Sequence, residues 1–222
     1  MMQLWRRVAW GRVMVQFSLL AITGVFLIVS LWRPIYPHEQ FLQHVPTVVA
    51  LLALSLAVRR RWLSTSALMC IVLFLWLHIL GARYIYSYVP YDEWLDKALG
   101  FSPTRQFSWR RNHYDRLVHV CFGALAVPPV CEIAQRFGGL RRMWAIVFAV
   151  SFTACLSSLY EIAEWIVAIV LSPESAEAYN GQQGDMWDAQ KDMALATGSS
   201  LLVAILMILA RPWRQRDPGP RA

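Results

Sequence analysis

Long apolar runs, separated by short polar segments, dominate the chain. A membrane-spanning helix needs about 20 mostly apolar residues. The predicted spans cover residues 13–32, 44–58, 63–82, 116–135, 143–171 and 193–210. The second is short and contains Pro46, whereas the fifth is long enough to tilt or to extend beyond the lipid. The pattern predicts an all-α, polytopic six-helix transmembrane bundle, with residues 13–210 as a single membrane domain.

The composition supports a membrane protein. Hydrophobic residues make up 57% of the chain and charged residues only 16%, and there are eleven tryptophans. This balance is typical of a polytopic protein whose main partner is the lipid bilayer. The net charge is +7, but the arginines lie between apolar runs and form no basic face, so we expect no nucleic-acid partner. The four cysteines all lie in apolar segments and form no CxxC pair, which is typical of small hydrophobic residues.

The positions of the basic residues predict the orientation. Most of them lie in residues 1–12, the turn at 59–61, the turn at 136–142 and the tail 211–222. With six spans these four segments fall on one side, and positive charge favours the cytoplasmic side. We therefore expect both termini in the cytoplasm, with a basic N-terminus (1–12) and a disordered basic tail (211–222). The long loop 83–115 is rich in Tyr and Trp, and we expect it to lie on the opposite membrane surface as a short amphipathic element.

The acidic residues show the opposite asymmetry. Of the fourteen, only Glu132 and Asp217 fall towards the cytoplasmic side, and all five histidines fall in the outer half. Any chemistry of this protein is therefore expected to face outward. Three segments carry the polar residues concerned.

The first segment, 112–120, begins the fourth span. Asp115 and His119 lie four residues apart, hence on one helical face. An acid in a first turn suits free N–H groups and the helix dipole, which is enough to explain Asp115. His119 lies a turn deeper and requires a buried partner.

The second segment, SSLYEIAEWIVAIVL (157–171), places two glutamates within a span. Glu161 and Glu164 lie about one turn apart on one face and too far from the start of the helix to cap it. A charged side chain within a span costs roughly 2.5–3.5 kcal/mol even on lenient scales. Three arrangements would offset that cost: the pair shares a proton, pairs with a basic residue, or ligates a metal ion.

The third segment, 181–198, leads into the sixth span. Asp185, Asp188 and Asp192 follow i, i+3, i+7 spacing, so we expect one acidic stripe. Asp185 is expected to cap the helix after the turn at Gly184. Asp192 lies beyond the reach of the helix dipole, and Lys191 is the nearest compensating charge.

Together these segments predict a polar site in the outer leaflet. The candidate ligands of a divalent metal are Asp115, His119, Glu161, Glu164, Asp188 and Asp192. Their hard oxygen and nitrogen donors suit Mg²⁺, Mn²⁺, Ca²⁺ or Zn²⁺, although the ExxE spacing without an ExxH partner is not a di-metal signature. The candidate catalytic residues are Glu161, Glu164 and His119. The basic residues predicted at the same level, to neutralise the acids or to bind an anionic head group, are Arg83, Arg111, Arg116 and Lys191.

Three motifs carry a resemblance to a known family. HYDRLVH at 113–119, SLYEIAEW at 158–165 and GDMWDAQKDM at 184–193 resemble the YjdF-like bacterial inner-membrane proteins. The resemblance covers about residues 10–210 and implies a small multi-pass protein of the cell inner membrane. It brings no settled reaction. The order of the three polar helices is also similar in layout to VanZ-like proteins, which are linked to glycopeptide-antibiotic tolerance at the cell envelope.

Three hypotheses for function remain open. The protein is a metal-assisted enzyme acting on a lipid or envelope precursor, a small-solute or proton transporter, or a non-catalytic scaffold with a structural polar network. A scaffold predicts that every acid has a basic or backbone donor. An enzyme predicts an open pocket beside Glu161. The sequence does not indicate an oligomeric state.

Overall fold

The computed structural model describes residues 2–170 and 182–210, with side chains from residue 11 onward. Its described elements are all helices: α1 (Met2–Ser30), α2 (Pro37–Arg59), α3 (Thr65–Arg83), α4 (Tyr91–Leu99), α5 (Pro103–Phe107), α6 (Tyr114–Arg136), α7 (Arg142–Val170) and α9 (Asp188–Leu209). Six of them are long and apolar enough to cross a membrane, namely α1, α2, α3, α6, α7 and α9. The predicted all-α architecture with six spans is confirmed. The predicted disorder of the tail 211–222 lies outside the described residues.

Helix α2 begins seven residues before the predicted span at 44. Pro37 lies in the first turn, where its missing N–H costs nothing. The following turns contain Gln40, Gln43 and His44, all of which are buried. Because these polar side chains face other helices, the segment is helical although its hydropathy is low. Pro46 lies within this helix and does not end it.

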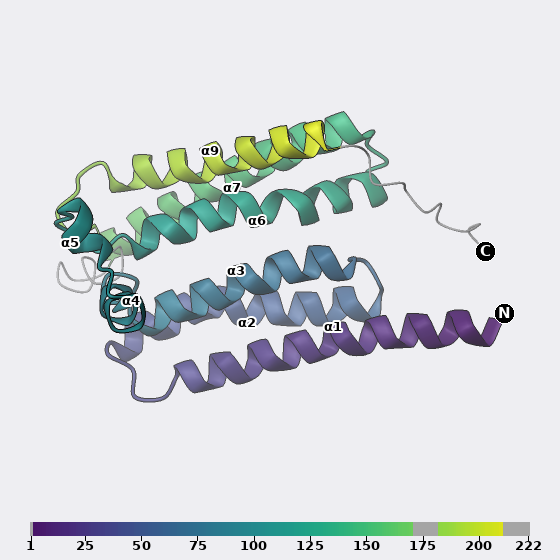
Figure 1. The fold of residues 1–222 in the computed structure, drawn as a ribbon. Helices are drawn as coiled ribbons and strands as arrows, with labels where there is room; N and C mark the ends of the chain where they lie inside the picture. The colour runs from purple at the N-terminus through teal and green to yellow at the C-terminus, as the bar shows by residue number, and fades with distance from the viewer. Residues whose placement is uncertain (1, 171–181, 211–222) are drawn as a thin grey trace.

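The six long helices form two groups of three, one above the other in Figure 1. Helices α1, α2 and α3 pack on one another, as do α6, α7 and α9, and α3 packs on α6 to join the two groups. We call them the first and second halves. The start of α1 and the end of α9 lie at one end of the bundle, and α4 and α5 lie at the other (Figure 1).

Each half has its own apolar core. Leu68 and Val72 are completely buried in the first half, and Val127 and Ala149 in the second. Helices α6 and α9 approach closely at Gly123, where a Cβ would collide with the carbonyl oxygen of Ala196. Many large apolar side chains lie exposed on the outer surface, as expected of helices surrounded by lipid tails.

The connection between the halves contains α4 and α5. Helix α4 has no buried residue. Asp92 in α4 accepts hydrogen bonds from Ser102 Oγ (2.9 Å) and from the backbone N–H of Thr104 (3.0 Å), which joins α4 to the start of α5. The chain then enters α6, whose first turn contains Asp115.

Candidate functional site

Three helices of the second half bring acidic side chains together at the α4–α5 end of the bundle. Asp115 and His119 come from α6, Glu161 from α7 and Asp192 from α9. One ligand atom from each of Asp115, His119 and Asp192 lies within 4.8 Å of the others. His119 Nε2 lies 3.7 Å from Asp115 Oδ1 and 3.4 Å from Glu161 Oε1. We call these four residues the acidic centre.

The acidic centre is buried and incompletely hydrogen-bonded. Asp192, His119 and Glu161 are 2%, 6% and 8% exposed. Among the described residues, Asp192 Oδ1, His119 Nδ1 and Glu161 Oε1 have no hydrogen-bond partner, the 3.4 Å contact of Glu161 with His119 being too poor to count as one. Nearly all buried polar groups in proteins are hydrogen-bonded. Three buried side-chain atoms of the acidic centre depart from this rule among the described residues.

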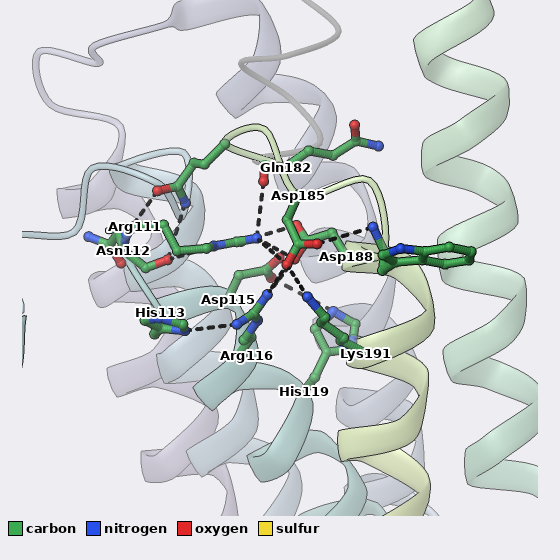
Figure 2. Close-up of polar contacts among 12 residues, drawn as sticks. Arg111, Asn112, His113, Asp115, Arg116, His119, Gln182, Asp185, Asp188 and Lys191 are labelled. Carbon is green, nitrogen blue, oxygen red and sulfur yellow. Dashed lines mark hydrogen bonds and ion pairs between the residues drawn. The ribbon is translucent and has the colours of Figure 1, made fainter. Parts of the chain in front are cut away.

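A separate layer of ion pairs lies next to the acidic centre (Figure 2). Arg111 donates to both carboxylate oxygens of Asp188, with Nη2 3.0 Å from Oδ2. Arg116 Nη2 lies 2.5 Å from Asp185 Oδ2 and 3.3 Å from Asp188 Oδ1. Lys191 Nζ lies 2.6 Å from Asp185 Oδ2. We call these five residues the arginine layer, in which the two aspartates are fully compensated.

Backbone contacts hold the arginine layer in place. Arg111 Nη1 donates to the carbonyl oxygen of Gln182 at 3.0 Å. The Gln183 amide accepts from the backbone N–H of Asn112 (2.8 Å) and donates to its carbonyl oxygen (3.2 Å). The segments before α6 and before α9 are therefore joined, which fixes the position of the guanidinium groups.

Two titratable groups outside the spans, one in this layer and one beside it, have shifted pKa values. A hydrogen bond from Lys191, with others from the Trp187 N–H and from Arg116, lowers the pKa of Asp185 to about 2. Burial, followed by the charges of Arg116 and Arg111, lowers the pKa of His113. At neutral pH Asp185 is therefore ionised and His113 is neutral, so the layer carries fixed charges.

The structure places four of the six predicted metal ligands in the acidic centre and the other two outside it. Asp115, His119 and Asp192 meet, and Glu161 adjoins them. Asp188 instead belongs to the arginine layer. Glu164 is hydrogen-bonded by the Tyr160 hydroxyl and lines a pocket shared with Glu161.

The predicted basic residues also divide. Arg111, Arg116 and Lys191 lie in the arginine layer. Arg83 makes its hydrogen bonds at the end of α1, donating to the carbonyl oxygens of Ser30 (2.9 Å) and Arg33 (3.2 Å).

The expectation that Asp185 caps the sixth span is wrong. Helix α9 begins at Asp188, its N-cap is Trp187, and that residue makes no side-chain capping bond. Asp185 lies in the preceding turn and accepts from the Trp187 N–H at 3.1 Å. Its carboxylate forms ion pairs with Arg116 and Lys191, and the linear spacing could not indicate the pair with Arg116.

Sequence reasoning did not single out several polar residues near the centre. Thr153 and Ser157 are buried on α7, about two turns and one turn before Glu161 on the same face. The four-residue spacing of these polar positions is the sequence pattern that could have indicated them. Thr47 on α2 is also buried, but nothing in the local sequence marks it, because the cavity that it lines includes residues of both halves.

Two cavities border the centre. One, of about 440 Å³, lies between α7 and the start of α9, and its lining includes Asp115, Glu161, Glu164, Asp188 and Asp192. The other, of about 280 Å³, lies between the halves and includes Asp115 and His119 in a largely apolar wall. The acidic centre is thus accessible from two sides.

Fold and site define a polytopic integral membrane protein with a buried acidic centre at one end of its bundle. The chain belongs to the predicted membrane proteins of the DUF2238 family, whose model matches residues 15–212. It is also 29% identical to the inner membrane protein YjdF of Escherichia coli (strain K12) over 187 residues, which cover 81% of this chain and 84% of that protein. The resemblance to YjdF-like proteins and the multi-pass inner-membrane location are confirmed. No solved structure matches the chain.

Proposed function

We propose that this protein is a divalent-metal-dependent enzyme that acts on the polar part of a lipid or envelope precursor. The observation that carries the proposal is the convergence of Asp115, His119 and Asp192 within 4.8 Å, with unpartnered buried atoms on the last two. Two carboxylates and an imidazole form a donor set suited to Zn²⁺ or Mn²⁺. Glu161, at 3.4 Å from His119, supplies a fourth ligand or a general base.

The charge of the site supports a bound cation. Its six acids are Asp115, Glu161, Glu164, Asp185, Asp188 and Asp192. In the described part of the chain, three cations form ion pairs with these acids, and all three pair with Asp185 or Asp188. Among the described residues, no Lys or Arg forms an ion pair with the acidic centre. A divalent ion would compensate its carboxylates and would polarise a carbonyl or phosphoryl oxygen or activate a water molecule.

The arginine layer suits an anionic substrate. Arg116 Nε is buried and has no hydrogen-bond partner among the described residues. Lys191 is about half exposed beside it. A phosphate or carboxylate group of the substrate at this position would accept charge-assisted hydrogen bonds from Arg116 and Lys191. The reacting bond of the substrate would then lie next to the acidic centre.

The orientation follows from the positive-inside rule. Helix α2 ends at Arg59, which Arg60 and Arg61 follow, and α6 ends at Arg136, with Arg141 in the turn after it. Both of these helix ends lie opposite the site. Positive charge in such turns favours the cytoplasmic side. Both termini are then cytoplasmic, and the site faces the outer leaflet.

The alternatives account for less of the structure. A scaffold network should satisfy each acid, yet Asp192 and Glu161 keep unpartnered oxygens. A transporter needs a polar route onward through the bundle. Instead, the second half is closed below the site by Val127, Ala145 and Ala149, all completely buried.

Two measurements on detergent-purified protein test this proposal. Elemental mass spectrometry should find about one divalent ion per chain, lost in Asp192→Asn and kept in Asp96→Asn, which alters an exposed acid paired with Arg105 in the α4–α5 region. Mass spectrometry of a bacterial lipid extract incubated with the protein should then show products only when the metal is present. Absence of metal in the wild type, or equal turnover by Asp192→Asn, would overturn the proposal.

A further inference from the structure

The cavity between the two halves has the character of a hydrocarbon site. Its walls include Phe74, Leu75, Val118, Phe122 and Leu156. Its volume of about 280 Å³ exceeds the roughly 150 Å³ of an engineered apolar cavity that binds benzene. At one edge it reaches Asp115 and His119, so it is continuous with the acidic centre.

The cavity lies between two helices that do not pack closely on each other. Helix α2 packs on α1 and α3, and α7 packs on α6 and α9. Both α2 and α7 line the cavity, but they are not among the helix pairs that pack closely on each other. Both helices are long and apolar enough to cross a membrane, so lipid tails are the medium around them.

Two hydroxyl groups in the cavity wall lack partners among the described residues. They belong to Thr47 on α2 and Ser157 on α7, which are 1% and 2% exposed. Hydroxyls in helices commonly bond to the preceding turn, as Ser55 and Ser158 do here. An apolar pocket with a few unsatisfied polar groups is typical of a ligand site, in which the polar groups fix orientation.

We propose that this cavity binds one hydrocarbon chain of a membrane lipid, entering between α2 and α7, with the polar end of the lipid at the acidic centre. Thr47 and Ser157 then hydrogen-bond the linkage between chain and head group. The inference rests on the proposed function, because it names the substrate of the same centre as a lipid with an anionic head. A lipid delivered from the side needs no aqueous path through the bundle, which agrees with the closed apolar core of the second half.

Photo-crosslinking tests the proposal on the full chain in vesicles of phosphatidylethanolamine and phosphatidylglycerol. One sample contains a phospholipid with a diazirine in its acyl chain, and the other a diazirine-bearing polyprenyl phosphate. Adducts mapped by peptide mass spectrometry should fall on cavity residues such as Phe74 and Phe122 in at least one sample. The sample that labels them identifies the class of lipid. Labelling confined to outward-facing side chains such as Leu52 in both samples would overturn the proposal.

A matched pair of variants on α2 provides the control. Ala50→Trp fills the cavity, whereas Ala53→Trp places the same ring on the exposed side of the helix. Cavity adducts should fall at least tenfold in the first and stay unchanged in the second. Equal labelling of the two folded variants would count against the proposal. If Ala50→Trp does not fold, the wild-type adduct map decides.

The metal content separates this inference from the proposed function. Ala50→Trp should retain its metal while losing cavity adducts, and Asp192→Asn should lose the metal while retaining them. Cavity adducts in a wild-type protein without metal would leave the lipid site standing and would refute the enzyme.

Discussion

Asp192→Asn should stabilise the metal-free protein and remove most of the stabilisation that a metal ion provides. Without metal, the substitution removes a 2%-exposed acid whose Oδ1 has no partner. A charged side chain within a span costs roughly 2.5–3.5 kcal/mol even on lenient scales. The metal-free variant should therefore be more stable than the metal-free wild type, by up to about 3 kcal/mol.

With metal, the same substitution removes one of three converging ligands. An ion at 100 times its dissociation constant stabilises the folded state by about 2.7 kcal/mol. Losing a ligand should weaken binding at least about 100-fold, equivalent to about 2.8 kcal/mol. At the same concentration the stabilisation then falls to about 0.4 kcal/mol.

Thermal unfolding in detergent micelles measures both effects. Wild type, Asp192→Asn and Asp96→Asn are each unfolded in chelator and in a series of Mn²⁺ or Zn²⁺ concentrations. The wild type and Asp96→Asn should gain stability with metal, and Asp192→Asn should start higher and gain little. An equal gain in all three proteins, or no gain in the wild type, would refute the assignment of the ligand.

Three further predictions concern packing and the arginine layer. Gly123→Ala should lose about 1–3 kcal/mol of stability, because its Cβ collides with the α9 backbone. Gly24→Ala, which has open space around it, should lose no stability. Equal unfolding behaviour of the two variants would argue against close packing of α6 on α9. Arg111→Lys keeps the charge but offers one nitrogen where two bind the buried carboxylate of Asp188. Chemical unfolding should therefore show a loss of stability of about 1.5–3 kcal/mol. An unchanged stability would refute the paired hydrogen bonds. The hydrogen bond from Lys191 is the largest cause that lowers the pKa of Asp185 from 3.8 to about 2. The stabilisation from Asp185 should therefore be complete above about pH 4 and lost as the pH falls towards 2. Acid unfolding of Asp185→Asn should lack this pH dependence, and identical acid profiles of variant and wild type would refute the prediction.

Buried acids without basic partners need another form of compensation, either bound protons or a bound cation. The arginine layer shows that the fold can pair acids with arginines where it needs to, as it does for Asp185 and Asp188. Asp115, Glu161 and Asp192 lie next to that layer and form no ion pair with its cations. The contrast within one site is the reason for preferring a ligand-binding centre over a structural network.

The spans and the special status of Glu161 could be predicted from the sequence. Whether a segment enters a membrane depends on its own summed hydropathy, which is a local property. Likewise, an acid in a span carries a large cost wherever its helix packs, so the position of Glu161 within an apolar run is enough to require a compensating partner. Asp115 and His119 share a helical face for the equally local reason of their four-residue spacing.

Only the tertiary structure decided which acids belong together. Asp188 and Asp192 lie one turn apart on α9, yet the first pairs with arginines and the second joins the centre. That division depends on how α9 is rotated against α6 and how closely the two approach at Gly123. The helices must also pack before Thr47 and Ser157 can line one cavity. Rotation and approach result from contacts between distant segments, and residue spacing within a helix carries no information about them.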